Sequence, residues 1–164
     1  MGAESGTEAG VMDRISFEEL LERDGKLVYS IRGVSMLPML RQDRDLVVIR
    51  AVDREADRFS GQRLRPYDVA FYRRGENYVL HRVISVTGWG YLLRGDNTYS
   101  LEKVPEEHVL GVLTSFVRDG REYEVTDPRY LIYVRLWCAS YGLRAAAVRG
   151  RGLLRRVLKR IFKR

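Results

Sequence analysis

The alternation of apolar and polar residues predicts a short helix, then a series of short strands, then a helical C-terminal segment. Residues 96–108 are polar and are expected to form a loop. The run at 45–52 is largely apolar and β-branched, which favours a buried strand. Apolar runs bounded by turn-forming residues are typical of strands, and they occur at residues 26–33, 45–52, 69–74, 78–86, 91–95, 109–117 and 123–126.

A helix over residues 17–24 is predicted from signals at both of its ends. Ser16 and Glu19 have the spacing of a capping box, in which each side chain binds the backbone N–H of the other residue. Gly25 follows the last helical residue, and glycine readily adopts the left-handed conformation that ends a helix.

Many short strands between frequent turns predict a mostly-β body, a barrel or a sandwich, over residues 14–127. Residues 1–13 are expected to be a disordered lead-in, because they are rich in Gly, Ser, Ala and Glu. They lack the basic and apolar regions of a signal peptide. Pro128 marks the start of a helical basic tail, residues 128–164. The chain has no apolar run of about 18 residues, so the sequence predicts no membrane-spanning helix.

Positive charge is concentrated at the C-terminus. The net charge is +7, but residues 144–164 contain nine Arg or Lys and no Asp or Glu, so the rest of the chain has a net charge of −2. Because the body has no basic excess, we expect no nucleic-acid partner for it. The one cysteine, Cys138, excludes an intrachain disulfide and is consistent with a cytoplasmic protein.

The stretch "RGVSMLPML" at residues 32–40 places a serine on a bend between Gly33 and Pro38. Glycine, serine and proline together are also typical of an ordinary turn. The alternative is that Ser35 is a nucleophile, and a serine nucleophile needs a base and an orienting group from elsewhere in the chain.

Two residues in the strand region qualify as those partners. His81 lies within the apolar strand 78–86, where an imidazole is costly to bury without a hydrogen-bond partner. Asp96 follows a strand in the sequence Gly-Asp-Asn, whereas the second histidine, His108, lies among acids and is expected to be exposed. Singly, Ser35, His81 and Asp96 suit structural roles; together they supply the nucleophile, base and acid of a serine hydrolase.

Four segments, in order, resemble those of a known peptidase family. "GVSMLP" is similar to the Ser-Met-x-Pro box of signal peptidases, and "DLVVI" to the strand after that box. "LHRVI" and "LLRGDN" resemble the His-Arg-Val and Gly-Asp-Asn segments of the endoplasmic-reticulum and archaeal type of signal peptidase. The resemblance covers about residues 29–117 and implies a LexA/signal-peptidase-like β fold, a barrel or a sandwich.

The resemblance also implies roles for individual residues. Ser35 would be the nucleophile, His81 the general base and Asp96 its supporting acid, and Glu102 occupies the position of a second family acid. For the oxyanion and substrate site it implies Gly33 and Met36, with backbone N–H groups binding the oxyanion. Gly33 replaces the serine usual in signal peptidases and is similar to LexA-type proteins.

The function that follows is serine endopeptidase activity on a peptide or precursor protein through an acyl-enzyme. No metal or other cofactor is expected for this chemistry. Two alternatives stay open. One is a non-catalytic module of the same fold that binds a peptide by strand addition. The other is a self-cleaving regulator, because Ala9-Gly10 resembles the bond that LexA-type proteins cut in themselves.

The tail offers a second function. In residues 150–164 an apolar stripe at helical spacing, from Leu153 to Phe162, alternates with Arg and Lys and no acid. Such a stripe most often packs on the protein's own core. The uninterrupted cationic face favours an anionic membrane surface instead, so we expect a cytoplasmic protein held peripherally at the membrane. RNA and an acidic protein partner stay open for this segment.

Overall fold

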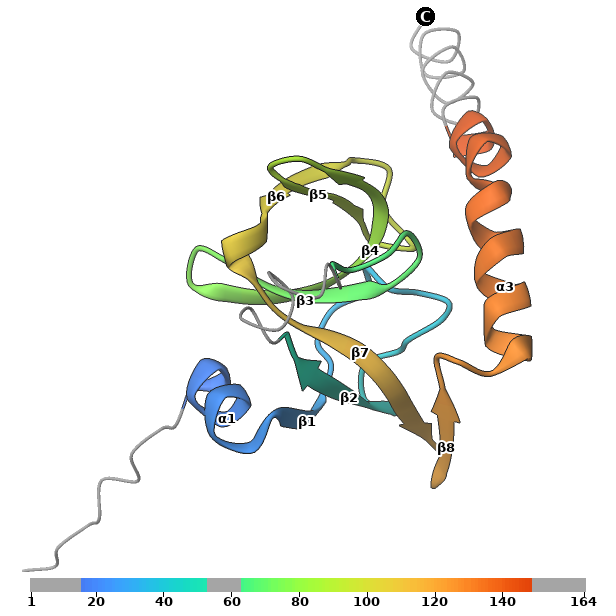
Figure 1. Cartoon of the computed structure of the whole chain (residues 1–164). Helices are drawn as coiled ribbons and strands as arrows, with labels where there is room; N and C mark the ends of the chain where they lie inside the picture. Colours follow the sequence, from blue (N-terminus) through green and yellow to red (C-terminus); the bar gives the residue numbers. More distant parts are fainter. Residues whose placement is uncertain (1–15, 53–62, 149–164) are drawn as a thin grey trace, which may run out of the picture.

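The computed structural model describes residues 16–52 and 63–148, and these form a curled antiparallel sheet with helices beside it (Figure 1). The prediction of a mostly-β body is confirmed. The order of the strands is β1-β2-β7-β3-β4-β5-β6, and β8 pairs with β7. The strands are β1 (Lys26–Ser30), β2 (Asp45–Ala51), β3 (Val69–Arg74), β4 (Asn77–Thr87), β5 (Gly90–Arg94), β6 (Glu102–Pro105), β7 (Val109–Arg118) and β8 (Arg121–Glu124).

The N-terminal helix α1 (Phe17–Asp24) has the predicted bounds. Both hydrogen bonds of the capping box are present, from Glu19 N–H to Ser16 Oγ and from Ser16 N–H to the Glu19 carboxylate. Gly25 has φ 68°, and its N–H donates to the carbonyl of Leu21. The sequence therefore specifies this helix locally, at both ends.

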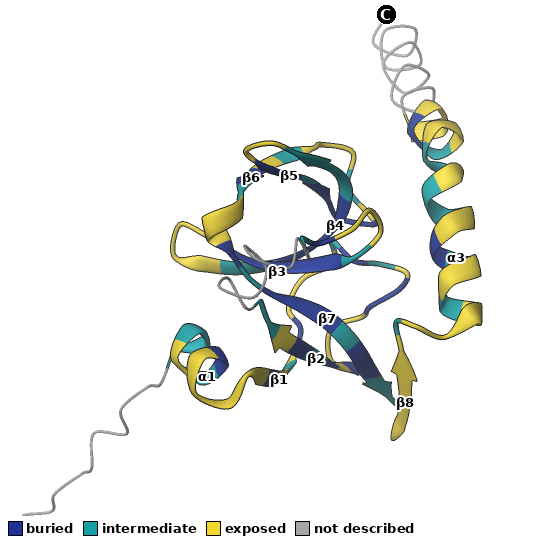
Figure 2. Ribbon diagram, viewed as in Figure 1, coloured by how far each residue is buried: buried dark blue, intermediate teal, exposed yellow. Residues whose placement is uncertain are grey.

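Two apolar clusters fill the curled sheet, and the central strand β3 separates them. Its odd residues, Val69 and Phe71, pack in the first cluster with α1, β1, β2 and β7. Its even residues, Ala70 and Tyr72, pack in the second cluster with β4, β5 and β6. Because side chains alternate along a strand, β3 is buried on both faces (Figure 2).

Two sequence predictions differ from the structure. Residues 96–108 are not all loop, because they contain β6 and a short 3-10 helix, η1 (Glu106–His108). Strand β6 pairs with β5 but contributes only Val104 to the core, so its apolar pattern is too short to recognise. Strand β2 is buried on one face only: Val47 and Ile49 are buried, whereas Leu46 is exposed.

Pro128 begins helix α3 (Pro128–Ala139), as the sequence predicts, and residues 141–148 are again helical. The predicted stripe at 153–162 lies outside the described residues. Among the residues that the structure describes, none of the helices combines the length and the apolar character needed to cross a bilayer. Helix α3 follows β8 and stands beside the sheet (Figure 1).

Candidate active site

Ser35 lies on a tight turn that follows β1. The N–H of Leu37 donates to the carbonyl of Val34, and the N–H of Leu40 to that of Met36, so the segment forms one helix-like turn. Met36 and Leu40 are buried, which anchors the turn in the first apolar cluster, while Ser35 itself is only partly buried. The turn therefore fixes the backbone of Ser35 and leaves the residue partly exposed.

A cleft of about 840 Å³ runs past this serine. One wall is the chain from Tyr29 to Met36, and the other is the hairpin of β3 and β4, from Arg74 to His81. Phe17, Tyr29 and Tyr78 form an aromatic group at the cleft, with ring centroids 5.1–5.2 Å apart for the two pairs that Phe17 makes. The cleft thus combines an apolar wall with the serine and the histidine.

Two strand edges border the cleft. Within the described part of the chain, β1 is the last strand of the sheet, and β5 pairs with β4 only from Arg82 onward. Residues 77–81 of β4 are therefore hydrogen-bonded to β3 on one side only. An open strand edge offers backbone donors and acceptors to an extended peptide.

His81 is buried, and its two ring nitrogens face different partners. Its Nδ1 lies 3.1 Å from the hydroxyl of Tyr72 and 3.5 Å from a carboxylate oxygen of Glu102. On the other side of the ring, Nε2 faces Gly95 and the turn that carries Ser35. The histidine is therefore held between an acid and the backbone of Gly95, which packs against the turn of the candidate nucleophile.

The hydrogen bonds around Tyr72 assign the tautomer of His81. The Tyr72 hydroxyl donates to Glu102 across 2.7 Å, and a phenol has only one hydrogen to donate. Nδ1 of His81 must then carry the hydrogen and donate to the Tyr72 oxygen. This leaves a lone pair on Nε2, the nitrogen on the Ser35 side, as a general base requires.

Burial lowers the pKa of His81 below its usual value of 6.5, against the opposing effect of Glu102. Burial and the neighbouring Glu102 raise the pKa of Tyr72, which therefore stays protonated. Partial burial alone would raise the pKa of Glu102, but the hydrogen bond from Tyr72 and the charges of His81 and Arg74 together lower it. At neutral pH the site holds a neutral imidazole beside an ionised carboxylate.

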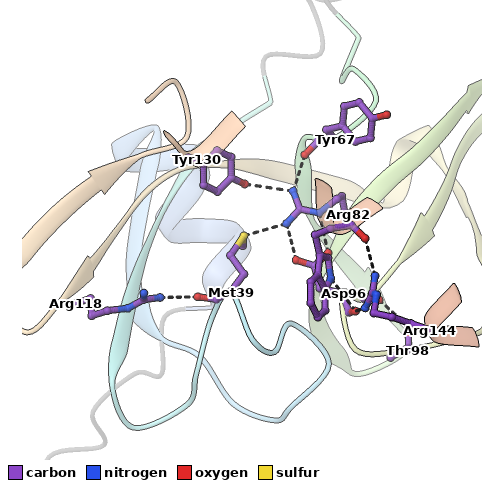
Figure 3. Close-up of polar contacts among 10 residues, drawn as sticks. Met39, Tyr67, Arg82, Asp96, Thr98, Arg118, Tyr130 and Arg144 are labelled. Carbon is purple, nitrogen blue, oxygen red and sulfur yellow. Dashed lines mark hydrogen bonds and ion pairs between the residues drawn. The ribbon is translucent and has the colours of Figure 1, made fainter. Parts of the chain in front are cut away.

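Asp96 lies behind the cleft, in an ion pair with Arg82 (Figure 3). Its two carboxylate oxygens accept from Nε and Nη2 of Arg82 at 2.7 and 2.6 Å, and both side chains are buried. The remaining guanidinium contacts go to the carbonyl of Tyr67, the hydroxyl of Tyr130 and the sulfur of Met39. Although burial opposes it, Asp96 raises the pKa of Arg82.

The backbone after β5 contacts the Ser35 turn directly. The N–H of Asn97 donates to the carbonyl of Ser35 at 2.8 Å, and the Asn97 side chain donates to the carbonyl of Val34. A Cβ on Gly95 would lie 2.6 Å from the Ser35 carbonyl oxygen and 3.0 Å from His81 Nε2. Only glycine allows this approach, so the Gly-Asp-Asn segment positions both the serine and the histidine.

The structure therefore brings Ser35, His81 and Glu102 to one cleft. Asp96, predicted as the supporting acid, gives both carboxylate oxygens to Arg82, whereas Glu102 has the position beside Nδ1. The N–H of Gly33, a predicted oxyanion residue, donates to the side chain of Gln42 at 2.8 Å. His108 is exposed, as predicted.

The sequence reasoning missed Tyr72, although a signal for it existed. The turn Gly75-Glu76 is a two-residue hairpin loop, which pairs Arg74 with Asn77 and hence Ala70 with His81. Tyr72 is two residues from Ala70 on the same face, so the hairpin register alone would have placed it diagonally opposite His81.

In the described ranges, 16–52 and 63–148, no group of three His, Cys, Asp or Glu side chains converges as metal ligands would. Compared with protein-family models and with curated proteins, the chain gives no match.

Proposed function

We propose that this protein is a serine endopeptidase of the LexA/signal-peptidase type, acting on an extended peptide segment. The observation that carries the proposal is His81, whose Nδ1 faces an acid through Tyr72 and whose Nε2 faces the Ser35 turn. A histidine that only stabilised the core would not need an open cleft and a serine turn on its basic side.

The proposed reaction is acyl transfer. The Ser35 hydroxyl attacks the carbonyl carbon of the scissile peptide bond while His81 Nε2 accepts its proton. The resulting imidazolium is stabilised by Glu102, and it returns the proton to the leaving amine. A water molecule, deprotonated by His81, then attacks the acyl-enzyme and releases Ser35 and the second product.

Backbone groups would stabilise the oxyanion. The N–H of Gly33 is already engaged by Gln42, so the N–H of Ser35 is the proposed donor. Gly33, with φ 87°, would contribute through the bend that presents the serine. Met36 would contribute by anchoring the turn in the core, where it is 4% exposed.

The substrate would lie extended between β1 and the first half of β4, where both strand edges are open. Backbone hydrogen bonds to these edges would give affinity without selecting a sequence. The aromatic group of Phe17, Tyr29 and Tyr78 would give selectivity for an apolar side chain away from the scissile bond.

The test is cleavage of a mixture of unstructured peptides, read by mass spectrometry, with wild type, Ser35→Ala and the control Ser85→Ala. Ser85 is a partly buried serine on β4, paired with Leu92 on β5. We expect cleavage by wild type and Ser85→Ala, none by Ser35→Ala, and unchanged melting temperatures. Cleavage that Ser35→Ala retains would exclude the assignment.

The same two open edges favour a second candidate, a non-catalytic module that binds peptides by strand addition. It predicts that wild type and Ser35→Ala bind the same peptides with equal affinity and that neither cleaves them. Equilibrium binding, measured beside the cleavage assay, therefore separates the two functions.

A further inference from the structure

The outward face of the C-terminal helical segment is aliphatic. Ile132, Leu136 and Leu143 are 59%, 67% and 78% exposed, and Ala139 between them is also exposed. Their spacing of four, three and four residues places them on one side of a helix. The N–H of Ser140 donates to the carbonyl of Leu136, and that of Arg144 to the carbonyl of Ser140, so helical hydrogen bonds continue across Ser140.

The opposite face of the same segment is already packed against the body, through the buried Val134 and through aromatic side chains. Tyr130, Trp137 and Tyr141 face the sheet: the Tyr130 hydroxyl meets Arg82, and the Trp137 indole donates to the carbonyl of Asp96. The guanidinium of Arg94 stacks 3.3 Å from the ring centroid of Tyr141. Docking of this segment therefore leaves its most apolar side outside.

The positive charge around the aliphatic stripe indicates which kind of partner binds it. From residue 128 to residue 164 the sequence has eleven Arg or Lys and no Asp or Glu. Arg129 and Arg135 are exposed, and helical spacing places them on either side of the stripe. Beyond the described residues the sequence repeats the pattern, with Leu154, Val157 and Ile161 spaced by three and four residues and Leu154 eleven residues after Leu143.

We propose that the face formed by Ile132, Leu136, Ala139 and Leu143 binds the surface of an anionic membrane. Aliphatic side chains would enter the boundary between headgroups and acyl chains, and the flanking arginines would pair with lipid phosphates. A second copy of the chain is a poorer occupant, because it would bring two acid-free cationic segments together. Nucleic acid would use the arginines and leave the aliphatic stripe exposed to water.

The helical segment that carries this face also contacts the backbone next to the candidate active site. The carbonyl of Asp96 accepts from Trp137 Nε1 at 3.1 Å and from Arg144 at 3.2 Å. The next residue, Asn97, holds the carbonyl of Ser35. A membrane-bound helix would therefore hold the cleft at a fixed distance and orientation, which favours substrates presented at the same surface.

The test is co-sedimentation of the full chain with vesicles of phosphatidylcholine alone or with phosphatidylglycerol. We expect binding that needs the anionic lipid, weakens as salt rises, and is about tenfold weaker or more in Leu136→Gln/Leu143→Gln. The matched control is Leu101→Gln, a leucine 51% exposed on the loop before β6, and it should bind as wild type. All changed side chains are exposed, so folding, checked by circular dichroism, should be preserved.

A second readout locates the face. The indole introduced by Leu143→Trp should be quenched by vesicles that carry brominated acyl chains. If the double variant binds vesicles as well as wild type, or if the indole is not quenched, the proposal is overturned. Any membrane binding would then be due to residues 149–164. Loss of self-association in the double variant, with vesicle binding unchanged, would identify the face as an interface between copies and overturn it equally.

Discussion

His81 and Arg82 are neighbours in the sequence, yet they serve two different regions on opposite faces of β4. The His81 side is a cleft in which the serine is half-buried and one ring nitrogen faces that serine's turn. On the Arg82 side, the buried guanidinium pairs with Asp96 and donates to the carbonyl of Tyr67 and to the hydroxyl of Tyr130 on α3. Strand β4 therefore separates a region suited to chemistry from a region that stabilises the fold around it.

The largest expected effect is on the cleft side. His81→Gln keeps a polar side chain but removes the base, so kcat/KM should fall about 10³-fold while the melting temperature changes little. The measurement is hydrolysis of a peptide identified in the mixture assay. A loss of less than tenfold would show that His81 is not the base.

On the opposite face, Arg82→Met should act on stability. It leaves the carboxylate of Asp96 buried without its partner, so we expect the free energy of unfolding to fall by about 3–5 kcal/mol in urea titrations. The control is Arg73→Met, which breaks an exposed pair with Glu18 and should change that free energy by less than about 1 kcal/mol. Equal effects of the two variants would contradict the contrast between the faces.

The two buried or partly buried acids, Glu102 and Asp96, should have different effects. Glu102→Gln should lower kcat/KM by about 10- to 100-fold at nearly unchanged stability, because it removes the charge that stabilises the imidazolium. Asp96→Asn should mainly lower stability, because it breaks the pair with Arg82. Glu124→Gln, an exposed acid on β8, is the neutral control. The opposite result would be an inactive but stable Asp96→Asn and a fully active Glu102→Gln. It would show that Asp96, and not Glu102, is the acid that supports His81.

The smallest effect is a shift in pH dependence. Burial lowers the pKa of His81 below 6.5, and the base acts when neutral, so kcat/KM should rise through a midpoint below 6.5 and level off near neutrality. The profile should be measured between about pH 4.5 and 8. A midpoint above 6.5 would mean that Glu102 outweighs burial.

Local signals made much of this fold predictable. Helix α1 and the hairpin of β3 and β4 are specified by residues close in sequence, through a cap, a glycine and a two-residue turn. Strand β6 was missed because its stability comes from pairing with β5 and from one core side chain, Val104. Patterns of burial cannot reveal a strand that is held mainly by backbone hydrogen bonds.

The residue types of the candidate site were predictable from the sequence, but which acid lies beside His81 was not. Ser35 and His81 stand out because a hydroxyl and an imidazole are unusual in their apolar surroundings. Which acid faces His81 depends on how β5, β6 and the Gly-Asp-Asn turn fold back on β4, and sequence order does not encode this. The guanidinium of Arg82 settles the position of Asp96, and a buried arginine is hard to foresee in a strand.

The length of the hairpin turn Gly75-Glu76 determines which side chains of β4 face the candidate active site. It sets the register in which Ala70 faces His81, and side chains change face at every residue. One residue inserted there would aim the guanidinium of Arg82 into the cleft and bury the imidazole against Met39 and Tyr130. Exposed turns usually tolerate insertions, but in this one the length should be fixed, and position 75, with φ 59°, should keep a residue that accepts the left-handed conformation.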